Sequence, residues 1–233
     1  MILKKYNFLL VVQARTESKR LPKKVIKKLS NSDVISIILK RLKKCKNVDK
    51  IIVATCKDKY YEKLIKILNK NNIDCFVGSK KNVLKRFYDL SKKYNTKNIV
   101  RITADCPLVD WKIIDSMIGK FKKNKFDYFC NTNPRTFPDG LDVEIFTMKA
   151  LKASFDKSVK NFDKEHVTSF IINSNKFKKS SISYYKNFGN IRFTIDNQKD
   201  YYFFKKVFNN FYPNIFFSWK DVINMNIKFN YNK

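Results

Sequence analysis

Apolar positions along the chain follow two patterns, short continuous runs and stripes with a spacing of three to four residues. The short runs predict strands at 8–12, 51–55, 74–77 and 98–102, of which 51–55 is expected to be buried. The stripes predict amphipathic helices at 33–42, 59–68 and 82–94. Asp33 is the expected cap of the first of these helices. Strands that alternate with helices are typical of parallel βαβ units, so the first half predicts a doubly wound α/β sheet.

The second half continues the alternation less regularly. It predicts strands at 126–130, 141–146, 180–185 and 191–195. Helices are expected from the cap Asp110 to about 122, and at 148–157, 163–172 with Asp163 as cap, 200–208 and 220–225. The segment 131–140 holds two of the five prolines and one of the four glycines, so it should leave the sheet. We expect a single domain over 1–233, in which an insertion would lie near 131–146.

Composition limits the class of protein. With 233 residues, 44% of them apolar, the chain is long enough for one sizeable core. No apolar run approaches the roughly 18 residues of a membrane span, and the run near the start is too short for a signal peptide. The five cysteines are too scattered for a disulfide framework or a zinc knuckle. These features favour a cytoplasmic protein without a membrane span.

The formal net charge of +30 is typical of proteins that attract polyanions. Only seven of the 50 cationic residues are arginine, and the lysines are spread over the whole chain beside abundant Asn, Ile, Phe and Tyr. That distribution resembles the residue usage of an AT-rich genome, with lysine on solvated helix faces. It favours weak general attraction to polyanions and argues against specific nucleic-acid binding.

The segment 13–24, QARTESKRLPKK, follows the first predicted strand and is rich in cations and hydroxyls. A loop between a strand and a helix is where open α/β sheets place an anionic ligand. Arg15, Arg20 and Lys24 would neutralise phosphoryl oxygens, the arginines through bidentate contacts. Ser18 and the loop amides would add hydrogen bonds. The loop therefore predicts a phosphate site.

The order R-x-x-S-x-R-L-P-x-K in this loop resembles the nucleotide-binding loop of the sugar-acid cytidylyltransferases. RITADCPLVD at 101–110 and RFTID at 192–196 resemble the second and third motifs of the same group. RTFPDGLDVE at 135–144 and EHVT at 165–168 resemble blocks of the spore coat polysaccharide biosynthesis type. The chain is most similar to that type, and the acylneuraminate and 3-deoxy-manno-octulosonate cytidylyltransferases resemble it more distantly.

The resemblance implies a GT-A-like, Rossmann-type α/β nucleotidyltransferase, with a mostly parallel central sheet and helices on both faces. It implies attack of a sugar-acid hydroxyl on the α-phosphorus of CTP, which gives a CMP-sugar and pyrophosphate for surface polysaccharide or glycan biosynthesis. Asp105 and Asp196 would hold Mg²⁺, which takes one or two carboxylates and completes its shell with phosphate oxygens and water. Arg15 and Lys24 would complete the catalytic set, holding the leaving pyrophosphate together with Arg20.

The other expected site residues are also implied by the resemblance. The nucleotide-binding set comprises Ala14, Arg15, Ser18, Arg20, Lys24, Gly78, Ser79, Arg86 and Thr103. The acceptor set comprises Arg135, Asp139, Asp142, Glu144 and His166, with the arginine on the sugar-acid carboxylate and the acids on sugar hydroxyls. An ordered turn is the alternative for 139–140, and the sole histidine is expected in the pocket, outside the chemistry. The segment 131–146 resembles a dimer-forming insertion, which favours a homodimer.

The loop departs from the family pattern at Glu17 and Lys23, where members usually carry glycine. Glycine permits positive φ and a close approach of the backbone to phosphate. Either Glu17 points away from the ligand or the loop binds triphosphate less tightly, and a member that binds nucleotide without turnover stays open.

Two further alternatives remain. The same fold serves other nucleotidyltransferases and glycosyltransferases, although glycosyltransferases normally carry a D-x-D motif instead of this basic loop. A non-enzymatic polyanion-binding protein would bind any strand or duplex in a salt-sensitive way, and replacement of Asp105 would not affect that binding.

Overall fold

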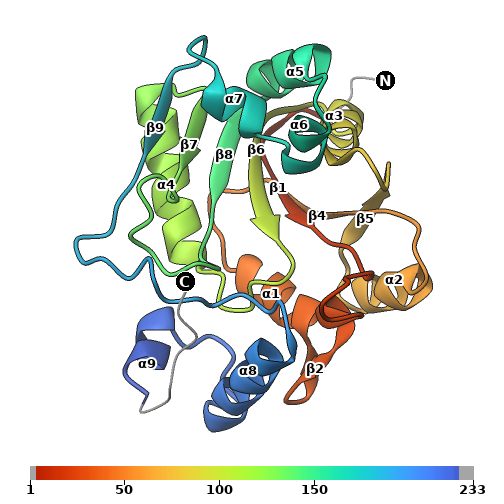
Figure 1. Cartoon of the computed structure of the whole chain (residues 1–233), viewed down its shortest axis with the longest axis vertical. Coiled ribbons are helices and arrows are strands. Elements are labelled where there is room, and N and C mark those ends of the chain that lie inside the picture. Colours follow the sequence, from red (N-terminus) through yellow and green to blue (C-terminus); the bar gives the residue numbers. More distant parts are fainter. Residues whose placement is uncertain (1–3, 226–233) are drawn as a thin grey trace.

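A seven-stranded sheet forms the centre of the computed structural model, which describes residues 4–225. Its order is β5-β4-β1-β6-β8-β7-β9, which runs from right to left in Figure 1. The strands are β1 Tyr6–Gln13, β4 Lys50–Thr55, β5 Asp74–Val77, β6 Thr96–Thr103, β7 Tyr128–Cys130, β8 Glu144–Thr147 and β9 Lys179–Ser181. The short strands β2 Lys28–Leu29 and β3 Ser32–Asp33 pair separately. From β5 to β6 all neighbours are parallel, and β8 is antiparallel to both β6 and β7.

Helices cover both faces of this sheet. They are α1 Val34–Leu42, α2 Tyr61–Lys70, α3 Val83–Lys93, α4 Trp111–Asn124, α5 Met148–Lys157, α6 Asn161–His166, α7 Ser169–Asn173, α8 Gln198–Asn210 and α9 Trp219–Ile223, with a 3₁₀ turn η1 at Lys24–Ile26. Side chains alternate across β1, so that Leu10 and Val12 pack with α1, α2, α4 and α8, and Leu9 and Val11 with α3, α5 and α7. The α/β fold class is therefore confirmed. No helix in residues 4–225 is long and apolar enough to cross a membrane.

The connections place a topological switch point between β1 and β6. From β1 the chain moves through α1 and α2 to β4 and β5 on one side, and then through α3 to β6 on the other side of β1. In open α/β sheets ligands bind outside the carboxyl ends of the strands at such a point. The loop after β1 and the loop after β6 both begin there.

The second half departs from the sequence expectations in three places. The predicted helix 163–172 is wrong, because Val167 takes φ 55 and separates α6 from α7. Asp163 therefore lies inside α6 instead of capping a helix, and it accepts a hydrogen bond from Ser169 Oγ at 2.6 Å. Of the predicted strand 180–185 only β9 forms. At 191–195 the structure has no strand, only an isolated bridge between Arg192 and Asp139. The apolar alternation there reflects burial of Ile191, Phe193 and Ile195 in the core without a neighbouring strand to pair with.

The other two predicted caps, Asp110 and Asp33, have different outcomes. Asp110 precedes α4 and its carboxylate accepts a hydrogen bond from the Lys112 amide at 2.8 Å, as a cap should. Asp33 occupies the same position before α1, but its side chain caps no helix amide. It pairs with Lys28 Nζ at 3.3 Å across the β2–β3 turn.

The segment after β7 leaves the sheet, as its turn residues predict. Asn131 holds the two ends of the excursion together, because its side chain donates to Leu141 O at 2.8 Å and accepts from Val143 N at 2.9 Å. Gly140 takes φ 105, and a Cβ at this position would lie 2.4 Å from Phe193 O. The excursion is thereby closed against the extended segment 191–193.

The two glycines at 140 and 119 give a matched test of this packing. Gly140→Ala should lower the free energy of unfolding by more than about 1 kcal/mol, because a side chain is strained at positive φ and meets a carbonyl. Gly119 lies inside α4 and a Cβ there meets no atom within 4 Å, so Gly119→Ala should raise it by about 0.5–1 kcal/mol. Denaturant unfolding measures both, and equal effects would contradict the close approach at Gly140.

Candidate functional site

Three of the predicted residues converge at the switch point. Lys24 Nζ donates to Asp105 Oδ2 at 2.6 Å and to Asp196 Oδ1 at 2.9 Å. Lys24 comes from the loop after β1, Asp105 follows β6, and Asp196 ends the extended segment 191–196. A backbone bond from Ile195 N to Asp105 O at 2.9 Å fixes the spacing of the two carboxylates. We call this group the carboxylate pair with its lysine.

Burial and charge act in opposite directions on this group. Burial favours the neutral form of Lys24, but the two carboxylates outweigh it and raise the lysine pKa. Burial likewise favours neutral Asp105, but Lys24 outweighs it and lowers the pKa of that carboxyl. The charged forms of Lys24 and Asp105 therefore stabilise each other. The positive charge of the lysine also offsets the repulsion between the two carboxylates.

The donor set fits a small divalent cation. Two carboxylates already converge on one ammonium group, which occupies the position of a cation between them. Within residues 4–225 no group of three or more His, Cys, Asp or Glu side chains could hold a metal ion. An ion here would therefore draw its remaining ligands from phosphate oxygens and water, which is the usual state of Mg²⁺.

Asp58 shapes the first half of the loop after β1. Its carboxylate accepts from Thr16 N at 2.9 Å, from the Thr16 hydroxyl and from Glu17 N at 3.2 Å. A bond from Lys23 N to Thr16 O at 2.9 Å then closes the loop. Sequence reasoning missed Asp58, which follows β4 and gives no motif signal.

The loop after β1 accommodates the two residues that stand in place of glycine, Lys23 and Glu17, in different ways. Lys23 takes φ 63, so a non-glycine residue adopts the left-handed conformation at a cost of about 1–2 kcal/mol. Glu17 is not among the positive-φ residues of the described chain. Its carboxylate pairs with Lys80 and accepts from Lys59 N at 3.4 Å, so it is directed at the loops after β4 and β5.

The arginines of the loop lie on its rim. Arg20 is 67% exposed and pairs with Asp196 Oδ2 at 3.1 Å. Arg15 is exposed, and no ion pair involving it occurs in the described part of the chain. Ser18 Oγ accepts from Leu21 N at 3.3 Å, which leaves its hydroxyl hydrogen free to donate. Ala14 is buried and continues the sheet through a bond to Ala54 O at 3.0 Å.

Arg86 holds the backbone of the loop after β5 through hydrogen bonds. The guanidinium is buried and donates to Ser79 O from Nε at 3.0 Å and from Nη2 at 2.8 Å. Gly78 leaves room for it, because a Cβ there would lie 2.6 Å from Arg86 Cγ. Burial lowers the arginine pKa, and nearby Cys56 partly offsets this.

The Thr103 hydroxyl lies 3.1 Å from Cys106 Sγ, beside Asp105.

Arg135, Asp139 and Asp142 form a second charged group in the excursion. Arg135 makes a bidentate contact with Asp142 at 2.6 and 2.8 Å and lies 3.6 Å from Asp139. Burial, together with Asp142, raises the pKa of the Asp139 carboxyl. Hydrogen bonds from Asp139 N to Ile191 O at 2.9 Å and from Phe193 N to Asp139 O at 2.6 Å join this group to the segment that carries Asp196.

Glu144 is a largely buried carboxylate whose partners all come from this chain. Oε1 accepts from Tyr128 Oη at 2.7 Å and from Thr168 Oγ1 at 2.6 Å, and Oε2 pairs with Arg101. Arg101 also donates to Gln13 Oε1 at 3.0 and 3.1 Å. Burial would raise the pKa of Glu144, but Arg101 and the two hydroxyls lower it. These contacts occupy both oxygens and tie β1, β6, β7 and β8 to the start of α7.

His166 lies on α6, next to α3 on the face opposite α1. It is exposed, and its ring packs against Phe162 with 4.2 Å between the ring centres. Among the described residues no contact joins it to the carboxylate pair. The structure therefore gives it no link to the charged groups at the switch point.

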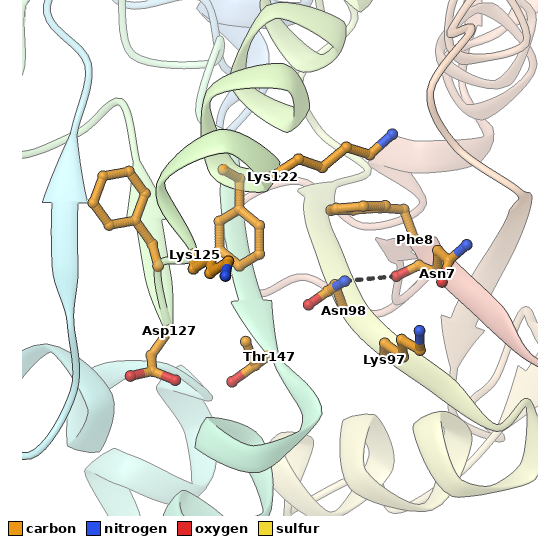
Figure 2. A pocket seen from close by; sticks show the side chains of 10 residues that line it. Asn7, Phe8, Lys97, Asn98, Lys122, Lys125, Asp127 and Thr147 are labelled. Atoms are coloured by element: carbon orange, nitrogen blue, oxygen red, sulfur yellow. Dashed lines mark hydrogen bonds between the residues drawn. The ribbon is translucent and has the colours of Figure 1, made fainter.

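A cavity of about 470 Å³ lies at the opposite edge of the sheet, at the amino ends of β1 and β6 (Figure 2). Aromatic residues and lysines line it, among them Phe8, Phe121, Phe126, Lys97, Lys122 and Lys125. Lys122 and Lys125 lie at the carboxyl end of α4, where cations complement the helix dipole. The cavity contains none of the predicted site residues.

The chain is similar to several known proteins. A family model described as cytidylyltransferase matches residues 9–221. An uncharacterised protein of Methanocaldococcus jannaschii is 39% identical over 94% of this chain and 86% of its own. The spore coat polysaccharide biosynthesis protein SpsF of Bacillus subtilis is 29% identical over 72% of this chain and 70% of its own. The solved structure of a cytidylyltransferase from Leptospira borgpetersenii has a TM-score of 0.86, with 30% identity, and covers 95% of this chain and 98% of that one.

Replacing Glu144 tests its structural role. Glu144→Gln should lower the free energy of unfolding by about 3–5 kcal/mol, because it leaves Arg101 with no carboxylate partner in a largely buried site. The control is Asp156→Asn, which breaks the exposed pair with Lys152 and should cost less than about 1 kcal/mol. A loss no larger than in the control would contradict the structural role.

The lowered pKa values of Asp105 and Glu144 also predict how stability depends on pH. A carboxyl whose pKa is lowered by folding contributes stability above its unfolded pKa, near 4 for both residue types, and loses it as the pH falls through the folded pKa. The free energy of unfolding should therefore fall steeply below about pH 4. The slope should be smaller in Glu144→Gln, and an unchanged slope would sink the assignment to this carboxyl.

Proposed function

Because the chain belongs to the cytidylyltransferase family, we propose that it transfers CMP from CTP to a hydroxyl of a sugar acid and releases pyrophosphate. Membership of the family makes it an enzyme of the nucleotidyltransferase class, in a family that uses CTP. Transfer of CMP to an acceptor hydroxyl is supported by one observation above all, the convergence of Lys24, Asp105 and Asp196 at the switch point. Surface polysaccharide or glycan biosynthesis is the proposed purpose, supported by the name of the Bacillus subtilis relative.

Nucleotidyl transfer depends on positioning and charge neutralisation more than on covalent help from the protein. Asp105 and Asp196 are the proposed ligands of Mg²⁺, which when bound would neutralise charge on the α-phosphate and on the attacking oxygen. Lys24 holds the two carboxylates together and lowers the pKa of Asp105. Arg15, Arg20 and Lys24 supply cations for the triphosphate, and the exposed arginines can reach it from the rim without breaking a buried contact.

The remaining nucleotide contacts are proposed for the loops beside this group. Ser18 and the main chain of Ala14 belong to the loop after β1, and Thr103 precedes Asp105. Gly78 and Ser79 would face the nucleobase through their backbone, and Arg86 would hold that backbone in place.

For the acceptor we propose the charged group of the excursion. Arg135 already binds a carboxylate through both of its terminal nitrogens, so its geometry suits the carboxylate of a sugar acid, which would replace Asp142. Asp142 and Asp139 would then accept hydrogen bonds from sugar hydroxyls. The structural contacts of Glu144 and the exposed position of His166 favour Arg135, Asp139 and Asp142 over these two as acceptor residues.

We propose that 1–233 forms one nucleotidyltransferase domain, whose ends at 1–3 and 226–233 lie outside the described residues, and that 131–146 contributes to a homodimer interface or to acceptor binding. A cytoplasmic location is part of the proposal, and it fits five cysteines that are all free thiols.

A pyrophosphate release assay tests the proposal. Wild type, with Mg²⁺ and a panel of sugar acids, should release pyrophosphate with CTP and not with ATP, GTP or UTP. Asp105→Ala should reduce release by at least about a hundredfold, because it removes an electrostatic contact to the reacting phosphates. Asp156→Asn on the exposed face of α5 is the control and should leave the rate unchanged.

The outcomes separate the alternatives. Release with another nucleotide alone would replace the nucleotide assignment. CTP binding by calorimetry without release, across the whole panel, would point to an acceptor of another class or to a member without turnover. The absence of CTP binding would overturn the proposal.

A further inference from the structure

The two oxygens of the Asp196 carboxylate have different partners. Oδ1 accepts from Lys24 Nζ at 2.9 Å, on the side of Asp105. Oδ2 lies 3.1 Å from a guanidinium nitrogen of Arg20 and 3.4 Å from Nη1 of Arg192. The two arginines therefore engage one oxygen and leave the other directed at the centre of the site. This division fixes which way the carboxylate turns.

Arg192 is less exposed than Arg20 and has an additional buried partner. Its side chain is 18% exposed, whereas that of Arg20 is 67% exposed. Its Nη2 donates to Asp200 Oδ1 at 2.6 Å, and Asp200 is 1% exposed. An exposed arginine can leave its partner for solvent or for a ligand at little cost, but Arg192 is fixed by a buried carboxylate.

Asp200 also holds the backbone that carries Asp196. Its Oδ2 accepts from Asp196 N at 2.8 Å and from Asn197 N at 3.0 Å. In return Asn197 Oδ1 accepts from Asp200 N at 3.0 Å, which completes a capping box at the start of α8. One buried carboxylate thus sets both the main chain of Asp196 and the arginine that orients its side chain.

The support behind this contact is rigid. Phe204, Val207 and Phe208 of α8 are buried in the core, so the helix that carries Asp200 is anchored to the sheet. The main chain of Arg192 is also fixed, by the backbone bridge to Asp139. Asp196 is therefore positioned through Arg192 from two packed elements.

We propose that Arg192 and Asp200 are positioning residues, which orient Asp196 so that Oδ1 and the carboxylate of Asp105 bind the divalent cation together. The inference rests on the proposed function, since it takes Asp105 and Asp196 as the ligands. Partners behind the ligands of a metal commonly change its affinity by about 10–100-fold when they are removed. Without Arg192, Oδ2 keeps only the exposed Arg20, and the carboxylate loses the one partner on that oxygen that is itself fixed by a buried group.

Binding of Mn²⁺ in the presence of CTP tests the role of Arg192, with the free ion measured by electron paramagnetic resonance. Arg192→Gln should weaken Mn²⁺ binding by about tenfold, and Arg192→Lys, which restores a cation, should recover part of the loss. CTP binding without metal should change little in both variants. Asp156→Asn should match the wild type in every measurement. Recovery by lysine separates orientation of Asp196 from a general loss of structure.

Asp200→Asn gives a second measurement on the same chain of contacts. It keeps a side-chain oxygen that can accept from the amides of Asp196 and Asn197, but removes the charge that holds Arg192. It should also weaken Mn²⁺ binding by about tenfold. Thermal unfolding of each variant shows whether the fold is retained, and Asp200→Asn replaces Arg192→Gln as the deciding variant if the latter does not fold.

The results distinguish this inference from the proposed function. Should wild type bind Mn²⁺, Asp105→Ala lose it, and both Arg192→Gln and Asp200→Asn bind as tightly as wild type, the positioning role is overturned and the proposed function stands. Tighter binding in Arg192→Gln would likewise overturn it, because the arginine would then act only by repelling the cation. No binding by wild type with CTP would overturn the proposed metal site, and this inference with it.

Discussion

A single buried ammonium group, shared between two carboxylates, holds the candidate site together. Asp105 and Asp196 come from distant parts of the chain, and as two anions in a partly buried site they would repel each other. Lys24 removes that repulsion and also anchors the loop after β1, so that three segments are fixed by one contact. The same arrangement keeps the site charged, because the lysine cannot readily lose its proton beside two carboxylates.

Sequence patterns were sufficient for the parts of the fold that local chemistry determines. Continuous apolar runs identified β1, β4 and β6, since strands buried on both faces need apolar side chains on both, and a shorter run identified the edge strand β5. The order of the motifs predicted the family, which the match to residues 9–221 confirms. It also named the three residues that meet at the switch point.

Contacts between distant segments explain what the sequence did not predict. The alternation at 191–195 is typical of a strand, but the segment is buried against the core without a partner strand along its length. Glu144 lies in a motif that suggests substrate contact, yet Arg101, Tyr128 and Thr168 occupy its oxygens, and none of these is recognisable as a partner from spacing. Asp58 was missed for the same reason. Glu17 became interpretable only once Lys80 was seen beside it.

The backbone bridge between Asp139 and Arg192 connects the charged group of the excursion to the segment that carries Asp196. Both the amide and the carbonyl of Asp139 bond to the segment 191–193, so displacement of the excursion is transmitted to the residues before Asp196. Thermodynamic linkage is reciprocal: if a ligand held by the excursion changes affinity at the carboxylates, a cation held there changes affinity for that ligand by the same factor. The order in which the two bind then affects the rates of assembly but leaves the total free energy of the assembled complex unchanged.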